Sequence, residues 1–236
     1  IDKPVQKFNK KNHYVQFESR INYLLNNNIK LNEKTFLDYG SGNCLFHEVI
    51  LDKKINNFKY YAIDTDNTVI DINRKKGINI EKSLSKYNAI KFDVILLFHI
   101  IEHLKAPIKL LKLLRKYLKV GGYLFIEVPN QDFLWKKNIE PHISFFNVNS
   151  ITELLINAGY KIIKIETCGK KLNVLMEQKT KIKMLRYKIG NVLKKYKIIK
   201  DKDDLIIDRP KDFIRSDMEV DIFGDNRQWI RVIAKK

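Results

Sequence analysis

The sequence is poor in residues that mark several classes of protein. It has two cysteines in 236 residues, which excludes a disulfide-rich scaffold and a Cys-x-x-Cys metal site. No apolar stretch approaches the roughly 20 residues that a membrane-spanning helix needs. Arginine is also scarce, because only 8 of the 45 basic residues are arginines. We therefore expect a protein of the reducing cytoplasm that has no transmembrane segment.

What the chain does contain is enough apolar material for a core. Hydrophobic residues make up 44% of it and charged residues 31%, which argues against disorder. The formal net charge is +18 and comes mostly from lysine. Such a charge fits either an anionic partner or an AT-rich coding bias. Recognition of nucleic acid tends to use arginine in a clustered patch, so a nucleic-acid partner is disfavoured.

Short apolar runs alternate with stretches of helical period along most of the chain. This alternation predicts an α/β fold with a mostly parallel sheet and helices on both faces. Strands are expected at Thr35–Tyr39, Phe58–Ile63, Ile78–Ile80, Phe92–Phe98, Tyr123–Val128 and Tyr160–Glu166, and an edge or antiparallel strand at Gln228–Ala234. Helices are expected within the first 30 residues, at Leu45–Leu51, at Thr68–Lys75, from Pro107 to the Gly121-Gly122 pair, and at Ser150–Ala158 with Ser150 or Asn149 as N-cap.

A long insertion separates the last two predicted strands. Residues 170–200 hold eleven basic residues and one acid, and residues 201–226 hold nine acids and four basic residues. The insertion could be a lid over an acceptor pocket, a basic surface for a phosphate-bearing or lipid-linked substrate or a membrane, or a solvated helix. We favour a lid built from both halves. The expected domains are a core at 1–168, a cap at 169–226 and a final core strand at 227–236.

The turn after the first predicted strand carries the strongest functional signal. Asp38 ends the strand, and Gly40-Ser41-Gly42 opens a helix. Glycines allow a ligand to approach the backbone, and a helix N-terminus offers free N–H groups. The acid before the first glycine suits an amine-bearing ligand better than a phosphate. Asp64 ends the second strand, where a carboxylate can accept both hydroxyls of a ribose.

These motifs resemble those of class I S-adenosylmethionine (SAM)-dependent methyltransferases, of the group that modifies quinone precursors and sugars. The resemblance covers roughly residues 33–166 and the final strand, and implies a seven-stranded Rossmann-like sheet. Cys44 stands where the family usually has its third glycine, and Ser83 where many relatives place an acid. The matching segments are LDYGSGNCLF, YAIDTD, FDVILLFHIIEHL, LLKLLRKYLKVGGYLFIEVPN and HISFFNVNSITELLINAGYKI.

The resemblance implies a SAM site at the ends of the strands, with S-adenosylhomocysteine as product. It assigns the methionine end and the nearby ribose edge to Asp38, Gly40, Ser41 and Gly42. It assigns the ribose diol to Asp64 and the neighbourhood of the adenine to Thr65, Ser83 and Leu84. Phe98 and His99 would lie beside the methionine moiety and the methyl group.

Three histidines are candidates for the acceptor side of the site. His99, His103 and His142 fall near the expected mouth, and histidine is the commonest base near neutral pH. His99 and His103 would share a face if their segment were helical, because they are i and i+4. His103 is equally readable as a structural histidine that pairs with backbone. His142 follows Pro141 and could line the acceptor pocket.

The segment from His99 to His103 also spells the H-x-x-E-H pattern of zinc peptidases. Its position directly after a buried strand does not suit that class. Quinone methyltransferases that resemble this chain carry Glu-x-x-Glu-His there and are associated with a divalent cation. We expect no metal in this chain; the alternative metal site would use His99, Glu102 and His103.

Three functions are compatible with these motifs. The first is methyl transfer to a small-molecule hydroxyl, most plausibly of a sugar, sugar nucleotide or related metabolite of surface-polysaccharide synthesis. The second is RNA methylation, which the net charge favours and the absence of an Asn-Pro-Pro-Tyr-type tetrapeptide disfavours. The third is a non-catalytic binding module of the same fold, which Cys44 and Ser83 would support. We expect a monomer or a homodimer.

Overall fold

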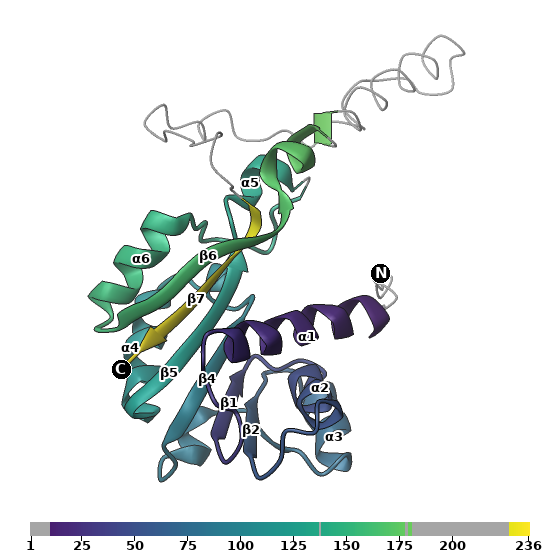
Figure 1. Cartoon of the computed structure of the whole chain (residues 1–236), viewed down its shortest axis with the longest axis vertical. Coiled ribbons are helices and arrows are strands. Elements are labelled where there is room, and N and C mark those ends of the chain that lie inside the picture. Colours follow the sequence, from purple (N-terminus) through teal and green to yellow (C-terminus); the bar gives the residue numbers. More distant parts are fainter. Residues whose placement is uncertain (1–9, 137, 178, 181–226) are drawn as a thin grey trace.

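The computed structural model describes residues 10–136, 138–177, 179–180 and 227–236. These residues form one seven-stranded sheet with helices packed on it (Figure 1). The helices are α1 (Lys10–Asn26), α2 (Leu45–Asp52), α3 (Asn67–Lys75), α4 (Pro107–Tyr117), α5 (Asp132–Trp135) and α6 (Val148–Asn157), with short 3₁₀ turns η1 (Leu84–Tyr87) and η2 (Ile101–His103). The strands are β1 (Thr35–Tyr39), β2 (Lys59–Ile63), β3 (Asn79–Glu81), β4 (Phe92–Phe98), β5 (Leu118–Pro129), β6 (Lys161–Lys171) and β7 (Arg227–Lys235).

The strand order confirms the predicted fold class. The sheet runs β3-β2-β1-β4-β5-β7-β6. The neighbouring pairs among β1 to β5 are parallel, and β7 runs antiparallel to both β5 and β6. Helices connect the parallel strands, as right-handed crossover units require. The antiparallel alternative for the last predicted strand is therefore correct.

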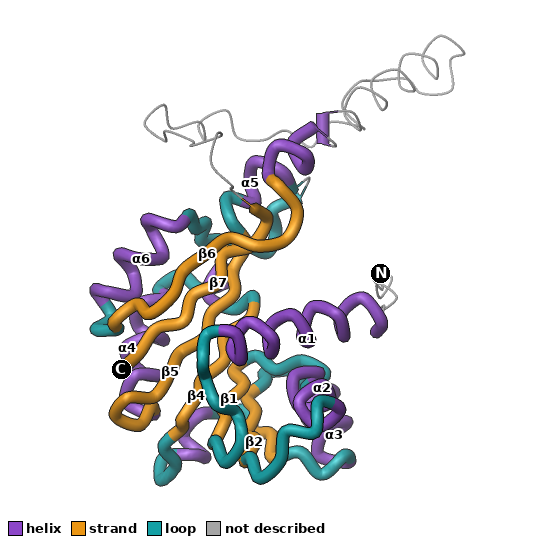
Figure 2. Tube along the Cα trace, in the orientation of Figure 1, coloured by secondary structure: helices purple, strands orange, loops and turns teal. Residues whose placement is uncertain are grey.

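Side chains of β4 show why both faces of the sheet are covered. Val94, Leu96 and Phe98 belong to one buried cluster, and Ile95 and Leu97 to the other. Successive strand residues point to opposite faces, so an unbroken apolar run indicates a strand buried on both sides. Residues of α1, α2 and α3 pack in the cluster with Val94, and residues of α4 and α6 in the cluster with Ile95. Figure 2 shows these two helical layers.

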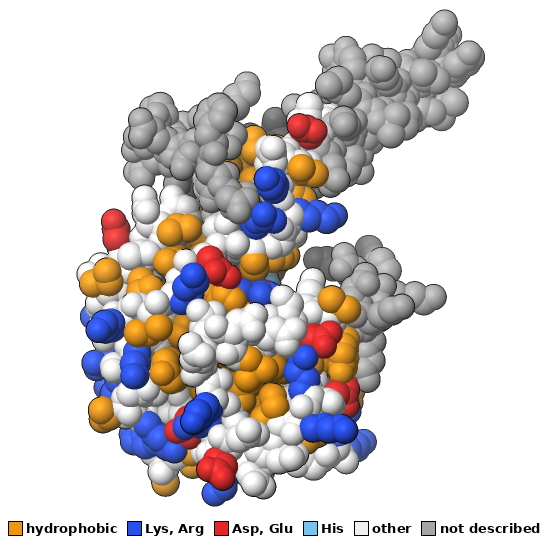
Figure 3. Space-filling view, viewed as in Figure 1, with side chains coloured by type: hydrophobic (Ala, Val, Ile, Leu, Met, Phe, Trp, Pro, Cys, Tyr) orange, Lys and Arg blue, Asp and Glu red, His pale blue; other side chains and the backbone are white. Residues whose placement is uncertain are grey.

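The surface mixes side chains of all kinds. On the face seen in Figure 3, lysines and arginines are scattered among acidic and apolar side chains. The described helices include none that is both long and apolar enough to cross a membrane.

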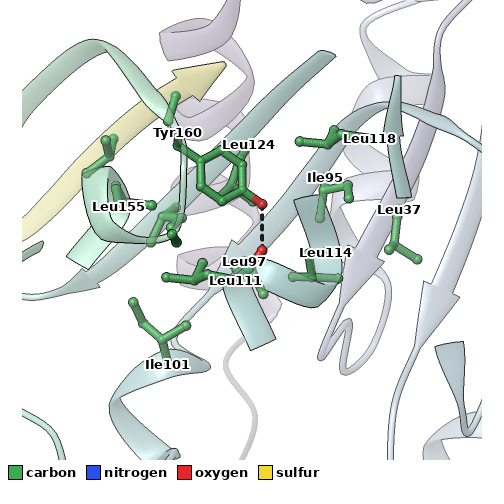
Figure 4. Close-up of a cluster of buried hydrophobic side chains, with 14 of the residues drawn as sticks. Leu37, Ile95, Leu97, Ile101, Leu111, Leu114, Leu118, Leu124, Leu155 and Tyr160 are labelled. Atoms are coloured by element: carbon green, nitrogen blue, oxygen red, sulfur yellow. Dashed lines mark hydrogen bonds between the residues drawn. The ribbon is translucent and has the colours of Figure 1, made fainter. Parts of the chain in front are cut away.

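A polar contact is buried within the cluster that α4 and α6 cover. Tyr160 lies among leucine and isoleucine side chains, and its hydroxyl donates a 2.9 Å hydrogen bond to the backbone oxygen of Leu111 (Figure 4). A buried hydroxyl without a partner would be costly. The bond therefore lets a tyrosine sit where α4 meets the strand that follows α6.

The structure corrects three local expectations. Helix α6 begins at Val148, because Asn147 is the N-cap and forms a capping box with Ser150. Neither Asn149 nor Ser150 is the cap. The Gly121-Gly122 pair lies inside β5, where the register shifts, rather than between a helix and a strand.

The strand before the insertion is also longer than expected. β6 ends at Lys171, so strand structure continues past residue 168, where we placed the boundary of the core. Most of the predicted cap, residues 181–226, lies outside the described residues. The division into core and cap stays a prediction.

Candidate functional site

The candidate site lies at the carboxyl ends of the parallel strands. The strand order reverses between β1 and β4, since β2 and β3 follow on one side of β1 and β5 lies on the other side of β4. The loops that leave two such strands go to opposite faces and open a crevice between them. All the candidate residues of the sequence fall on these strand ends or on the loops that follow them.

The glycine turn after β1 is held close to the neighbouring loops. The backbone N–H groups of Gly40 and Ser41 donate to the Ile63 oxygen at 2.8 and 3.1 Å. Gly40 has a φ of +77°, and a Cβ there would lie 2.0 Å from the Cδ1 atom of Ile100. Gly42 has a φ of +51°, and a Cβ at this position would have no heavy atom within 4 Å. The turn therefore needs glycine at its first position and offers open space at its last.

Cys44 occupies the N-cap of α2 with a φ of +55°. A non-glycine residue in this left-handed region is strained, which explains why glycine is usual at this place in the resembling family. The Cys44 side chain is fully buried, and its sulfur lies 3.5 Å from the Ser41 hydroxyl. Burial raises the pKa of the Cys44 thiol to about 11. The thiol thus packs in the core as a neutral group.

Asp38, two residues before the glycine turn, has a side chain that is buried in the protein. It is 2% exposed and accepts a 2.6 Å hydrogen bond from the hydroxyl of Tyr60. Burial raises the pKa of Asp38 to about 6, against the lowering effects of the Tyr60 bond and of Arg20. In this geometry the carboxylate is held inside the protein by Tyr60.

Asp64 stands at the open rim of the same turn. One of its carboxylate oxygens accepts from the Gly42 N–H at 2.9 Å, and the other accepts from the Asp66 N–H at 3.0 Å. The side chain is partly exposed, and Thr65 beside it is exposed. Each carboxylate oxygen has a second lone pair, so Asp64 can accept further hydrogen bonds from a ligand. The structure therefore brings Asp64 against the glycine turn.

The loop after β3 lies on the same side of the sheet. Ser83 is exposed and caps η1, where its hydroxyl oxygen accepts from the Ser85 N–H. Leu84 is buried in the hydrophobic cluster that α4 covers. Of these two predicted residues, Ser83 thus reaches the rim by its side chain, while Leu84 is directed inward.

Phe98 and His99 end β4 and face different surroundings. Phe98 is 8% exposed and packs edge-on against Phe17 of α1. His99 has a φ of +57°, and its ring lies edge-on to Trp229. Its Nε2 lies 3.3 Å from the Glu127 carboxylate. Burial lowers the pKa of His99, but the Glu102 and Glu127 carboxylates outweigh it, so the pKa is raised overall.

Glu127 forms a buried cluster of charges that the sequence did not reveal. Its carboxylate accepts from Arg20 of α1 at 2.5 and 3.0 Å and from Arg231 of β7 at 2.5 Å. All three side chains are less than a tenth exposed. Burial raises the pKa of Glu127, but the two guanidinium groups and His99 hold it well below its usual range. The one available signal was a lone acid inside the apolar run Phe125–Val128.

A second cluster gathers at the loop between β5 and α6. The rings of His103 and His142 lie 4.7 Å apart, and Nδ1 of His142 lies 2.6 Å from a carboxylate oxygen of Asp132. Lys136 lies 3.1 Å from the same carboxylate. Burial, together with Lys136, lowers the pKa of His142. Asp132 is 1% exposed, and sequence reasoning missed it.

Glu102 completes this second cluster from η2. Its side chain is 1% exposed, and neither carboxylate oxygen accepts a hydrogen bond from the described residues. His99 Nδ1 lies 3.3 Å from one of these oxygens. Glu102, His103 and His142 present ligand-type atoms that all lie within 4.8 Å of one another. This set differs from the expected alternative, because His142 takes the place of His99.

The condition under which His99 and His103 would share a face, a helical segment, is not met. Their segment is not a continuous α-helix, since His99 adopts a left-handed conformation and η2 is a single 3₁₀ turn. His99 is therefore directed toward Glu127 and Trp229, whereas His103 meets His142 and lies 3.4 Å from the Pro141 oxygen. The structure divides the three histidines between two neighbouring clusters.

A family model described as a methyltransferase domain matches residues 9–165. No curated protein matches the chain significantly. Solved structures with a similar fold include a SAM-dependent methyltransferase from Archaeoglobus fulgidus, 19% identical over 93% of this chain and 94% of that one, with a TM-score of 0.56. Another comes from Mesorhizobium loti, at 11% identity, 91% and 96% coverage and a TM-score of 0.56. A third comes from Clostridium acetobutylicum. It is 13% identical over 93% of this chain and 89% of that one, with a TM-score of 0.53.

Proposed function

This chain belongs to the class I SAM-dependent methyltransferases, and from that premise we propose that it methylates a hydroxyl group of a small molecule. The acceptor that we favour is a sugar, a sugar nucleotide or a related metabolite of surface-polysaccharide synthesis. The observation that carries the proposal is the cluster of Glu102, His103 and His142, which lies on loops at the same edge of the sheet as the glycine turn.

The turn after β1 has the features that the cofactor needs. SAM supplies an electrophilic methyl group on a sulfonium, and its ribose and amino acid ends must be held in place. Gly42 leaves open space above the turn, and Asp64 keeps lone pairs for the ribose hydroxyls. We assign the methionine end to Gly40, Ser41 and Gly42, with Asp38 beneath them. Thr65 and Ser83 are exposed and would border the adenine, with Leu84 behind.

Methyl transfer from a sulfonium mainly requires proximity and in-line orientation. A hydroxyl acceptor must also lose a proton, and a general base contributes about 10²–10⁴-fold to such steps. His103 is exposed, and His142 is held by Asp132. We assign the proton transfer to this cluster rather than to His99, whose ring is engaged by Glu127 and Trp229.

The chain after β6 approaches the acceptor side. The ammonium of Lys179 donates to the backbone oxygens of Phe133 and Leu134 at 3.2 and 2.8 Å. Both residues directly follow Asp132. This contact supports our proposal that the insertion after β6 forms a cap over the acceptor, where its lysines would favour a phosphate-bearing substrate such as a sugar nucleotide.

The proposal is tested in two steps. Calorimetric titration with SAM and S-adenosylhomocysteine establishes the cofactor site. Incubation with SAM and a panel of sugar nucleotides, followed by mass spectrometry, then looks for a gain of one methyl group. We expect an O-methyl product that His142→Ala strongly reduces, whereas His47→Ala, at a packing histidine between Phe58 and Tyr60, leaves it intact. Methylation of RNA alone would contradict the proposal.

A further inference from the structure

We propose that Glu102, His103 and His142 bind one divalent cation of the Zn²⁺ type at the acceptor side of the site. The three residues come from η2 and from the loop between α5 and α6. Their ligand atoms all lie within 4.8 Å of one another. Two imidazoles and one carboxylate are a common set of three protein ligands for catalytic zinc, which keeps a fourth position for water or substrate.

Both histidines are arranged to present the same nitrogen. Nδ1 of His142 lies 2.6 Å from the Asp132 carboxylate, and Nδ1 of His103 lies 3.4 Å from the Pro141 oxygen. Acceptors at these positions favour a proton on Nδ1. Each ring then keeps its Nε2 lone pair for a cation. Histidine ligands usually donate their other ring N–H to a carboxylate or carbonyl in this way, so Asp132 is a positioning residue for His142.

Glu102 supplies an independent sign that something is bound here. A carboxylate that is 1% exposed and accepts no hydrogen bond from the described residues is expensive to bury. Buried carboxylates are usually paired with a cationic group or hold a metal. Nδ1 of His99 lies 3.3 Å from Oε1 of this carboxylate. A cation between Glu102, His103 and His142 would satisfy the remaining oxygen.

The backbone holds the ligand loop against Glu102. The Glu102 backbone oxygen accepts from the N–H groups of Ile143 and Ser144 at 2.9 and 3.0 Å, and the Ser144 hydroxyl donates to the Leu104 oxygen at 2.9 Å. These bonds fix the loop directly after His142. Little reorganisation is therefore needed to bring the three ligands onto one ion.

Lys136 is the group that competes with a cation for this place. Its ammonium lies 3.3 Å from Nε2 of His142 and 3.1 Å from the Asp132 carboxylate. The side chain is 27% exposed and is long and flexible, so it can swing outward into solvent. Because an ammonium repels a divalent cation, removal of Lys136 should tighten metal binding.

The cation would also give the proposed methyl transfer a way to activate the acceptor hydroxyl. This part of the inference rests on the proposed function. A divalent ion lowers the pKa of a bound hydroxyl and orients it. With the cation bound, His103 and His142 would act on the acceptor proton through the ion and not as bases themselves. An acceptor hydroxyl in the fourth position would lose its proton to solvent, and its oxygen would then attack the methyl carbon of SAM. The oxygen–carbon bond forms as the carbon–sulfur bond breaks, and S-adenosylhomocysteine leaves as the neutral thioether.

The experiment titrates Co²⁺, as a coloured substitute for Zn²⁺, into the tag-free full chain. We expect one equivalent to give visible d–d bands that Zn²⁺ abolishes. Glu102→Gln and His142→Gln should remove the bands. Asp132→Asn should weaken binding by about 10–100-fold, and Lys136→Met should strengthen it. His47→Gln is the matched control. Unchanged binding of S-adenosylhomocysteine shows that each variant is folded.

The outcomes separate this inference from the proposed function. Absence of a one-equivalent Co²⁺ site, or a site that survives Glu102→Gln, overturns the inference whatever the enzyme methylates. Loss of binding in His99→Asn with full binding in His142→Gln also overturns it, because the ligands would then be a different set. Saturable Co²⁺ binding with the expected variant pattern supports the site even if no hydroxyl is methylated, in which case the proposed acceptor alone is wrong.

Discussion

Arg20 and Glu127 form a buried ion pair across 107 positions of the chain. The guanidinium donates two hydrogen bonds to one carboxylate oxygen, at 2.5 and 3.0 Å, and also stacks 4.4 Å from the ring centre of Phe98. Arg231 engages the other carboxylate oxygen. One acid of β5 therefore connects α1 to β7, and it also meets His99 of the candidate site.

We predict that Glu127→Gln destabilises the fold strongly. The substitution leaves Arg20 and Arg231 as buried charges without their anion, and breaking a buried pair in this way costs about 3–5 kcal/mol. Glu81→Gln is the matched control, because Glu81 pairs with Arg74 at the surface, where such pairs contribute roughly 0–1 kcal/mol. Urea unfolding measures both. Equal losses in the two variants would contradict the prediction.

We predict that Asp64→Ala weakens SAM binding without unfolding the protein. A charged hydrogen-bond acceptor for the ribose is lost, at about 1–3 kcal/mol, together with the bond from the Gly42 N–H. Asp66→Ala removes a neighbouring carboxylate that caps α3. It should cost about 1 kcal/mol of stability and leave the affinity for SAM unchanged. Calorimetry with both variants checks this, and equal affinities would refute the assignment.

Much of the fold was predictable from local patterns. The apolar run Phe92–Phe98 is buried on both faces and was placed with its observed bounds. Pro107 marked the start of α4, because proline fits the first helical turn. Errors arose where two local signals competed. Asn147 caps α6 through a bond to Ser150, yet Ser150 itself has a side chain that suits a cap.

The site was predictable only in its local part. Asp64 and the glycine turn lie at strand ends that the sequence marks clearly, and the structure joins them. The buried ion pairs of Glu127 and Arg231 were not predicted, because the partners lie about a hundred residues apart in the sequence. The separation of His99 from His103 and His142 was not predicted either. His99 contacts Glu127 and Trp229, and the spacing of histidines along the sequence does not reveal such tertiary contacts.

We predict that Cys44→Gly is more stable than Cys44→Ala. Both variants remove the buried sulfur, but only glycine accepts a φ of +55° without strain. A left-handed residue with a Cβ carries roughly 1–2 kcal/mol of strain, which exceeds the entropy that glycine adds to the unfolded chain. Thermal unfolding of the two variants gives the difference directly. An alanine variant as stable as the glycine variant would show that this backbone is unstrained.

We predict that Asp38→Asn changes how stability depends on pH. The folded protein holds the pKa of Asp38 at about 6, above its ordinary 3.8, so between these values the native state binds more protons than the unfolded chain. Stability from Asp38 is therefore fully present below the lower pKa and is lost as pH rises through the higher one. The loss is about 3 kcal/mol, at 1.36 kcal/mol per pKa unit.

Asparagine does not titrate, and its side-chain oxygen can still accept from Tyr60. Urea unfolding without cofactor, from about pH 4 to about pH 7, measures this. The free energy of unfolding of the variant should rise relative to that of the wild type as the pH increases. Parallel curves would mean that Asp38 ionises in the folded protein as it does in water.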